Sequence, residues 1–330
     1  MGGLGLVLSG GGAPAAYFGA GVARAIEDLG LTPDVVSGVS AGALNAAALG
    51  HGLTATELAA MWESISWHDI YGIRTDVWNA VDLRGLFTPG GNPVERALDS
   101  VGWTWLLDTS PGERTLARHL GADESGQFTV QAGRTLVVSA VEQASGEVVR
   151  FCSALPPRSR RSDGGFKRVR ISTGHVLASA AVPLLFPPGR IGTKTYVDAG
   201  LVANTPLAPV MAYEPDAVIV VSGAGVARPA RDPRTWGEAI ELLADNVAYF
   251  SLMADYKHAL TVNTLAAAAP GATAKRHVPM LLISPSELGF SLGGFLRFTA
   301  EDARRVIEYG RREATGRIRR WLTERRRAAG

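Results

Sequence analysis

A serine placed between two glycines is the clearest candidate for chemistry in this sequence. Gly38-Val39-Ser40-Ala41-Gly42 fits the pattern G-x-S-x-G, with an apolar run before it and a helical pattern after it. A serine on such a strand-to-helix turn is held out of the sheet, and the helix directs free N–H groups toward negative charge that develops there. Gly38 and Gly42 keep the crowded backbone free of clashes. The pattern predicts Ser40 as a nucleophile toward acyl carbons, although an ordinary turn has the same composition.

Three successive glycines follow the first apolar run. Gly10-Gly11-Gly12-Ala13 presents unobstructed backbone N–H groups, which suit an oxyanion hole or a phosphate cradle. The first and third of these glycines, with Ala15, also fit G-x-G-x-x-A, and Asp34 follows at the distance of a ribose-binding acid. A dinucleotide site of the NAD type is therefore an alternative. Against it, Pro14 removes one N–H from the turn, and Asp34 leads directly into the serine motif.

A serine nucleophile needs a base. None of the six histidines has an acid partner that the sequence can name, and only His175 precedes a suggestive segment, residues 178–183. Asp198 ends an apolar run, and the active-site groups of α/β proteins gather at such strand ends. Asp198 is thus the stronger candidate, although Asp-Ala-Gly is also ordinary turn chemistry. The sequence contains no H-E-x-x-H, EF-hand or cysteine-pair pattern, so we expect neither a metal nor a cofactor.

The elements that must position these residues alternate between strands and helices. Helical patterns cover residues 15–29, 41–49 and 236–265. Apolar runs predict strands at residues 4–9, 34–39, 135–141, 148–152, 194–197, 217–222 and 280–283. This alternation predicts an α/β fold with a largely parallel sheet. Residues 54–127 hold five of the seven tryptophans and predict a helical and loop-rich insertion, for which a lid over an apolar pocket is one interpretation.

Composition and charge exclude several classes of protein. With 330 residues, 46% hydrophobic and 19% charged, the chain is too apolar for disorder or a fibre. A single cysteine excludes an internal disulfide and a multi-cysteine zinc site. We expect a cytoplasmic protein, since residues 1–23 lack the basic start of a signal peptide and no run reaches the ~20 apolar residues of a membrane span. Residues 301–327 hold ten arginines, which we interpret as the solvated face of a docked helix rather than as a nucleic-acid site.

Four blocks of the sequence together resemble the patatin-like phospholipases. They are Gly10-Gly11-Gly12, the motif around Ser40, Ala178-Ser179-Ala180-Ala181-Val182-Pro183 with Phe186, and Asp198-Ala199-Gly200 with Asn204-Thr205-Pro206, and they frame residues 4–210. The resemblance implies an α/β fold in three layers, with a mostly parallel central sheet flanked by helices. It implies a single domain over residues 1–330, with the insertion at about 54–127 and an arginine-rich C-terminal helix at about 300–327.

The resemblance also implies a catalytic dyad in place of a triad. Ser40 would be the nucleophile and Asp198 its base, and the backbone amides of Gly10, Gly11, Gly12 and Ala13 would form the oxyanion hole. The chain departs from the family at Pro14, where Arg or Lys is usual, and at Ala15, where Gly is usual. This departure bears on the rate and on the preference for anionic phospholipids.

The activity implied by the resemblance is hydrolysis of carboxylic esters of lipids through an acyl-enzyme, as in a phospholipase A, a lysophospholipase or an esterase. An acyltransferase or thioesterase would use the same dyad, and an NAD-type oxidoreductase is the further alternative. The expected partner is a lipid or acyl-ester substrate. Peripheral membrane contact would arise through that substrate, no nucleic acid is expected, and the sequence indicates no oligomeric state.

Overall fold

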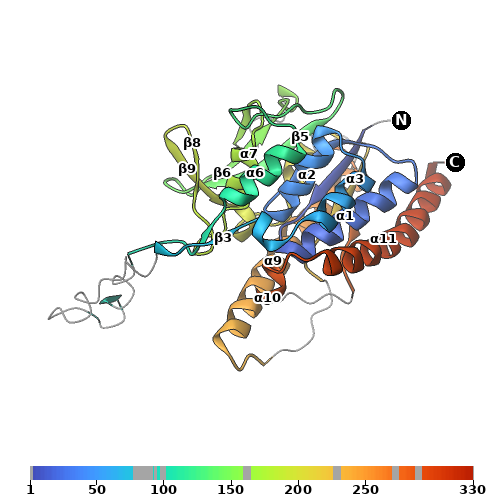
Figure 1. Cartoon of the computed structure of the whole chain (residues 1–330). Coiled ribbons are helices and arrows are strands. Elements are labelled where there is room, and N and C mark those ends of the chain that lie inside the picture. The colour runs from blue at the N-terminus through green and yellow to red at the C-terminus, as the bar shows by residue number, and fades with distance from the viewer. Residues whose placement is uncertain are drawn as a thin grey trace.

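Parallel strands form the centre of the fold, because buried apolar runs alternate with helices long enough to cross back over the sheet. The computed structural model describes residues 3–76, 92, 95–96, 102–158, 165–225, 232–269, 275–286 and 292–329. Within this part of the chain, a sheet of nine strands has the order β11-β10-β1-β2-β5-β6-β7, with β9 beside β5 and β8 beside β9 (Figure 1). Of the predicted insertion at 54–127, residues 77–91, 93–94 and 97–101 lie outside the described residues.

The strands of this sheet are mostly parallel. β1 pairs in parallel with β2 and β10, as do β2 with β5 and β10 with β11, whereas β6 and β9 run antiparallel to β5. The strands are β1 (Leu4–Leu8), β2 (Pro33–Gly38), β5 (Thr135–Glu142), β6 (Val148–Cys152), β7 (Phe166–Arg168), β8 (Gly189–Ile191), β9 (Lys194–Asp198), β10 (Ala217–Val221) and β11 (Met280–Ile283). A separate short ribbon pairs β3 (Gly72–Ile73) with β4 (Leu107–Asp108).

Among the described helices, α2 and α9 begin at the residues predicted from the sequence, Ala41 and Trp236. The described helices are α1 (Gly12–Asp28), α2 (Ala41–His51), α3 (Ala55–Ser64), α6 (Ser110–His119), α7 (Thr173–Ser179), α8 (Leu207–Met211), α9 (Trp236–Ala268), α10 (Leu292–Phe295) and α11 (Ala300–Ala329), with 3₁₀ turns η1 (Trp67–Asp69) and η4 (Ala199–Leu201). α1 begins at Gly12 and not at the predicted residue 15. Pro14 falls in its first turn, where its missing N–H has no intrahelical partner to lose.

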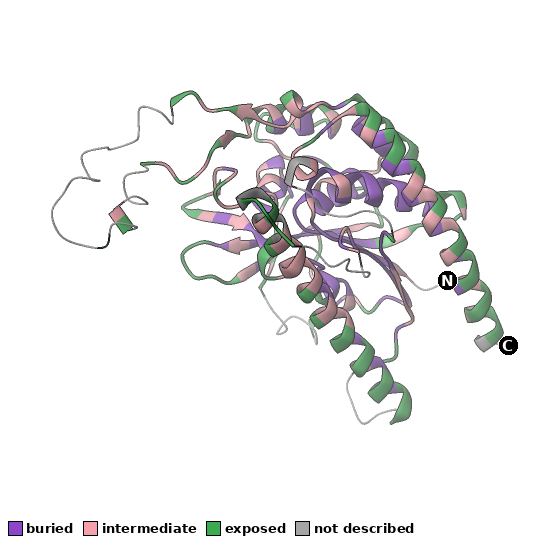
Figure 2. Cartoon of the chain, turned by 90° about the horizontal axis from the view of Figure 1, so that it is seen from below, coloured by how far each residue is buried: buried purple, intermediate pink, exposed green. Residues whose placement is uncertain are grey.

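Helices cover both faces of the sheet. Side chains alternate between the two faces along each strand. In β10, Ile219 and Val221 belong to the core cluster shared with α1, α2, α3 and α11, whereas Val218 and Val220 belong to a second cluster with α8 and α9. Figure 2 shows the sheet buried between these layers, with the outer face of α11 exposed. The predicted α/β class, with a mostly parallel central sheet flanked by helices, is confirmed.

Two glycines allow α11 to lie directly on α1. A Cβ atom at Gly21 of α1 would overlap the carbonyl oxygen of Ile307, and a Cβ atom at Gly310 of α11 would lie 2.7 Å from the carbonyl oxygen of Phe18. The C-terminal helix therefore packs closely on α1, the helix that begins at the last glycine of the run, Gly12.

We predict that Gly21→Ala lowers the free energy of unfolding by about 1–3 kcal/mol, because the added methyl forces α1 and α11 apart. Gly316→Ala on α11 is the matched control, since its Cβ would meet nothing within 4 Å and alanine favours a helix by up to about 1 kcal/mol. Urea denaturation of both variants measures the difference. Equal stability of the two variants would contradict the close packing of these helices.

Candidate active site

Ser40 occupies a strained turn between β2 and α2. Its φ of +54° lies in the left-handed region that residues other than glycine rarely adopt. The N–H of Ser40 donates to the carbonyl oxygen of Ser179 at 3.1 Å, and the hydroxyl of Ser179 donates to the carbonyl oxygen of Ser139 at 2.6 Å. The end of α7 therefore ties the turn to β5 and holds the strained conformation.

The glycines on either side of Ser40 are required by close backbone contacts. A Cβ atom at Gly38 would overlap the carbonyl oxygen of Gly42, and a Cβ atom at Gly42 would overlap that of Leu8 at the end of β1. The spacing G-x-S-x-G thus lets the serine turn pack against the end of the neighbouring strand. This contact places Ser40 beside the glycine run that follows β1.

The edge of β5 brings Asp198 to Ser40. The first half of β5 pairs with β2, where Gly38 lies opposite Val138, and its second half pairs with β9, where Asp198 lies opposite Ala140. Both partners lie on the edge of β5 that faces away from β6, because β6 pairs with Val137–Val141 along the other edge. Two residues along a strand correspond to ~7 Å, so the ends of β2 and β9 meet at one place.

Asp198 is a buried carboxylate that lies beside Ser40 and accepts a hydrogen bond from Gly200. The residue is only 4% exposed, and the N–H of Gly200 donates a hydrogen bond to Oδ1 at 2.6 Å. Burial raises the pKa of Asp198 to about 6, and hydrogen bonds from the Ser40 side chain and from the Gly200 N–H oppose this rise. The Ser40 hydroxyl therefore faces an acceptor that holds a proton at acid pH and releases it near neutrality.

The glycine run leaves three backbone amides free beside Ser40. Gly11 and Gly12 have φ values of +140° and +64°, and within the described residues the N–H groups of Gly11, Gly12 and Ala13 have no acceptor. The N–H of Gly10 differs from the prediction, because it donates to the carbonyl oxygen of Asn204 at 3.3 Å. Three of the four predicted amides are thus available to an anion at the start of α1.

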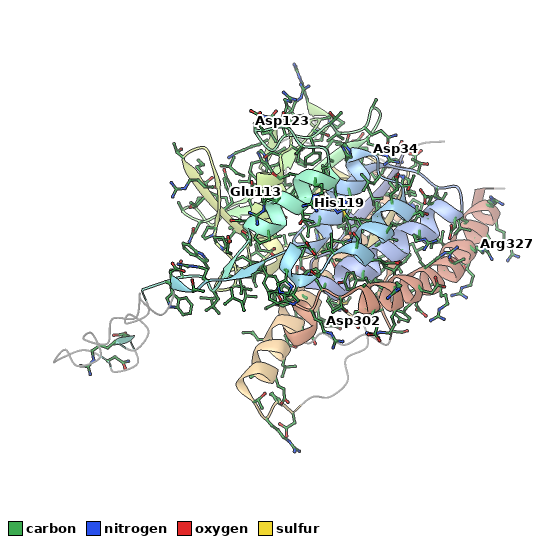
Figure 3. The ribbon with its side chains drawn as sticks, viewed as in Figure 1. Asp34, Glu113, His119, Asp123, Asp302 and Arg327 are labelled. Atoms are coloured by element: carbon green, nitrogen blue, oxygen red, sulfur yellow. The ribbon has the colours of Figure 1, made fainter. Side chains whose placement is uncertain are left out.

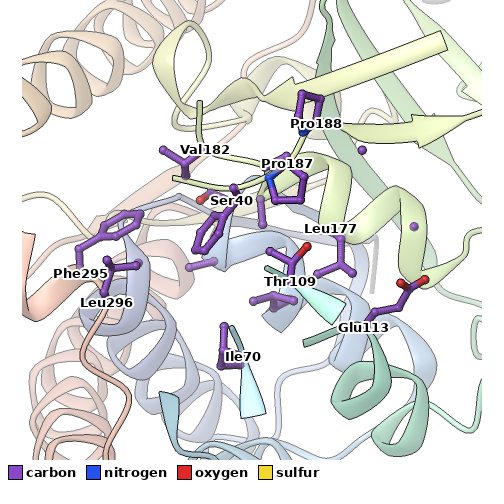
Figure 4. A pocket seen from close by; sticks show the side chains of 18 of the residues that line it. Ser40, Ile70, Thr109, Glu113, Leu177, Val182, Pro187, Pro188, Phe295 and Leu296 are labelled. Atoms are coloured by element: carbon purple, nitrogen blue, oxygen red, sulfur yellow. The ribbon is translucent and has the colours of Figure 1, made fainter. Parts of the chain in front are cut away.

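A cavity of about 250 Å³ opens next to Ser40 (Figure 4). Leu177, Val182 and Phe295 are among the side chains that make most of its lining apolar, and Glu113 lies at the side of the cavity away from Phe295. Ile70, Thr109 and Glu113 come from the predicted insertion at 54–127, so this segment forms part of the wall. A cavity of this character suits an acyl chain.

His175 has a structural role. Its Nδ1 lies 2.6 Å from the Ser172 hydroxyl and accepts the Ser172 N–H at 3.1 Å, which caps α7. Burial lowers the pKa of His175 to about 4, and its ring packs edge-on against Phe151. The segment that His175 precedes matters through Ser179, whose role the sequence alone did not indicate.

The NAD-type alternative is wrong in its placement of Asp34. This residue lies at the amino end of β2, where its carboxylate accepts the N–H of Leu4 at 2.8 Å. A ribose-binding acid belongs at the carboxyl end of the second strand, beside the glycine turn. In Figure 3, Asp34 lies near the N-terminus, far from Glu113 at the cavity. The described residues also contain no group of three or more His, Cys, Asp or Glu side chains that could hold a metal ion.

Besides Ser179, the described region contains other residues of the site that the sequence did not single out for a role. Asn204 belongs to a block quoted for the family resemblance, but its contact with Gly10 follows only from the fold. Phe295 and Leu296 line the cavity from the C-terminal part of the chain, and no pattern in the sequence connects them with Ser40.

The sequence model described as patatin-like phospholipase matches residues 6–211. No curated protein matches the chain.

Three solved structures are similar to the chain at low identity. VipD from Legionella pneumophila is 16% identical with a TM-score of 0.43, over 95% of this chain and 66% of that one. The type III effector protein ExoU is 15% identical with a TM-score of 0.42, over 97% of this chain and 53% of that one. Human GIVD cytosolic phospholipase A2 is 13% identical with a TM-score of 0.47, over 98% of this chain and 60% of that one. The chain spans between about half and two thirds of these proteins.

We predict that Asp198→Asn stabilises the protein at alkaline pH. A carboxyl group whose pKa is raised on folding contributes stability below its unfolded pKa, near 3.8, and this contribution is lost as the pH rises through about 6. The asparagine variant carries no such charge, so its free energy of unfolding at pH 8 should exceed that of the wild type by up to about 3 kcal/mol. Urea denaturation at pH 4 and pH 8 measures this. A difference that does not grow between the two pH values would show that Asp198 is not buried as a charge.

Proposed function

Because the chain belongs to the patatin-like phospholipase family, we propose that it is a serine acyl hydrolase that cleaves carboxylic ester bonds of lipids through Ser40 and Asp198. The observation that carries the proposal is the position of Ser40, on a strained turn, beside a buried carboxylate whose pKa is raised to about 6. Free amides and an apolar cavity lie beside this pair. These are the parts that acyl transfer requires.

The first half of the reaction acylates Ser40. The ester carbonyl carbon lies against Oγ, the hydroxyl proton moves to the Asp198 carboxylate, and a bond forms between Oγ and the carbonyl carbon. The carbonyl oxygen becomes an oxyanion and accepts hydrogen bonds from the N–H groups of Gly11, Gly12 and Ala13. When the tetrahedral intermediate collapses, the bond to the alcohol oxygen breaks, and the leaving alcohol takes the proton from Asp198.

The second half returns Ser40 to its free form. Water enters, gives a proton to the Asp198 carboxylate and attacks the acyl carbon, and the same amides bind the second oxyanion. Collapse releases the fatty acid as Oγ recovers its proton. An alcohol or thiol acceptor in place of water would make the same site an acyltransferase, and product analysis with added acceptor separates the two reactions.

The raised pKa of Asp198 supports its role as the base. A carboxylate with an ordinary pKa near 3.9 is a weak proton acceptor, and burial brings the affinity of Asp198 for a proton closer to that needed near neutral pH. No cation in the described part of the chain contributes to the pKa of Asp198. Pro14, at the place where the family usually has a cation, is consistent with this arrangement.

Peripheral membrane contact is part of the proposal, and the exposed side chains beside the cavity support it. Ile73 is 71% exposed and Leu184 is 70% exposed. Ile73 belongs to β3, which pairs with β4, and Leu106, just before β4, donates its N–H to the carbonyl oxygen of Leu184. Val182 and Phe186, on either side of Leu184, line the cavity. Exposed apolar side chains at the mouth of an apolar pocket favour contact with lipid. No helix in the described part of the chain is both long and apolar enough to cross a bilayer.

We predict that kcat/KM for a soluble short-chain ester rises as the pH rises through about 6, because Asp198 must lose its proton before it can act as the base.

We also predict that Ser40→Ala lowers kcat for this ester by about 10³-fold or more, because it removes the nucleophile. Ser37→Ala is the control, since Ser37 is also buried in the same strand and turn but its hydroxyl has no hydrogen-bond partner among the described residues. Hydrolysis by Ser40→Ala at the wild-type rate would refute the proposed nucleophile.

We predict that the double variant Ile73→Asp and Leu184→Asp binds phosphatidylcholine vesicles at least about tenfold more weakly, because two apolar side chains that would enter the lipid become charged. Hydrolysis of the soluble ester should not change, since neither side chain lines the cavity. Leu265→Asp is the matched control. Leu265 is 55% exposed near the C-terminal end of α9, which leads to the amino end of β11 and away from the site. Vesicle pelleting measures the bound fraction of each variant. Equal binding by the double variant and by Leu265→Asp would contradict this contact surface.

A further inference from the structure

Asn204 is fixed beside the dyad by both of its backbone polar groups. Its N–H donates to the hydroxyl of Ser251 on α9 at 2.9 Å, and its carbonyl oxygen accepts the N–H of Gly10 at 3.3 Å. The chain at Asn204 therefore connects α9 with the glycine run. A residue held from two sides presents its side chain in one place.

The side chain of Asn204 shares a narrow space with Ser40. Its Oδ1 lies 2.7 Å from the position that a Cβ atom would take at Gly10, and that same position is 2.8 Å from Cβ and 3.5 Å from Oγ of Ser40. Oδ1 also lies 3.2 Å from the Cβ position of Gly200, whose N–H donates to Asp198. Oδ1 of Asn204 thus borders the space over Gly10 that Ser40 also borders, and Gly10 has no side chain because these groups fill that space.

The Nδ2 group of Asn204 has no hydrogen-bond partner among the described residues, although Asn204 is only 4% exposed. A buried donor without an acceptor destabilises the folded protein, and such groups are uncommon in native structures. Asn204 therefore carries a cost in the resting protein. Side chains that carry such a cost beside reacting groups are candidates for a role in the reaction.

We propose that Asn204 is a positioning residue for Ser40. Its side-chain amide borders the same space over Gly10 as Oγ and confines Oγ there, and rotation of the amide lets Nδ2 donate a hydrogen bond to Oγ as its proton passes to Asp198. This inference rests on the proposed function, because only a serine that loses its proton gains charge for Nδ2 to stabilise. The amide is neutral, so it adds no charge that would change the pKa of Asp198.

Asn204→Leu tests this role because leucine has a similar shape and no polar atoms. For the soluble ester we expect kcat to fall by about 10- to 100-fold while KM stays within about twofold, because Ser40 loses its donor but the cavity is unchanged. The melting temperature should stay equal or rise, because the substitution removes a buried donor that had no partner. A purely structural role would give the opposite result, a lower melting temperature.

Thr205→Val is the matched control. Thr205 is 1% exposed and its Oγ1 also has no partner among the described residues, but it is not among the groups nearest to the Gly10 Cβ position that Ser40 borders. We expect this variant to keep the wild-type kcat and to have an equal or higher melting temperature. Asn204→Ala is a second test that introduces no larger side chain, and it should show the same loss in kcat with unchanged KM.

Three outcomes would overturn the proposal. They are a wild-type kcat in Asn204→Leu and Asn204→Ala, a loss of kcat that accompanies a lower melting temperature in both, and an equal loss of kcat in Thr205→Val. The proposed function fails separately, when the wild-type protein does not hydrolyse the ester or when Ser40→Ala remains active, and the role of Asn204 then falls with it.

Discussion

The burial of the Asp198 carboxylate beside Ser40 is the constraint on which the rest of the site depends. Loss of water around this group raises its pKa, and hydrogen bonding to Ser40 and Gly200 opposes the rise. No cation in the described part of the chain contributes. The carboxylate is therefore a stronger base than an exposed aspartate and a destabilising element of the fold. The sheet keeps it in place, because β2 and β9 share one edge of β5 and their ends carry the two members of the dyad.

The other costly features of the site are held by contacts of the same kind. The strained backbone of Ser40 is tied through Ser179 to β5, and the unpaired amide of Asn204 is tied through Ser251 to α9. The two helices that supply these ties, α7 and α9, are far apart in sequence and pack on opposite faces of the sheet. The large apolar core between the sheet, α1 and α11 stabilises the molecule enough to tolerate them.

Local patterns in the sequence predicted the strands and the reactive turns, and distant contacts could not be predicted. The runs at 135–141 and 280–283 contain enough apolar residues to define strands, and the strands observed there begin at the predicted residues. β7 and β8 are three residues long and each carries charge, so they give no recognisable pattern. The position of Asp198 at a strand end made it the stronger candidate for the base of Ser40, and the family resemblance implied the dyad. Nothing local indicates that both strands pair with one edge of β5. The bond between Gly10 and Asn204 joins segments far apart in the sequence and was not predicted.

The central claim is that Ser40 is an activated nucleophile with Asp198 as its base. The most direct measurement is labelling of the folded protein with a fluorophosphonate probe between pH 5 and pH 8, followed by intact mass and peptide mapping. We predict one adduct, on Ser40, that forms faster as the pH rises through about 6. A folded protein that carries no adduct, or an adduct on another residue, would contradict the account.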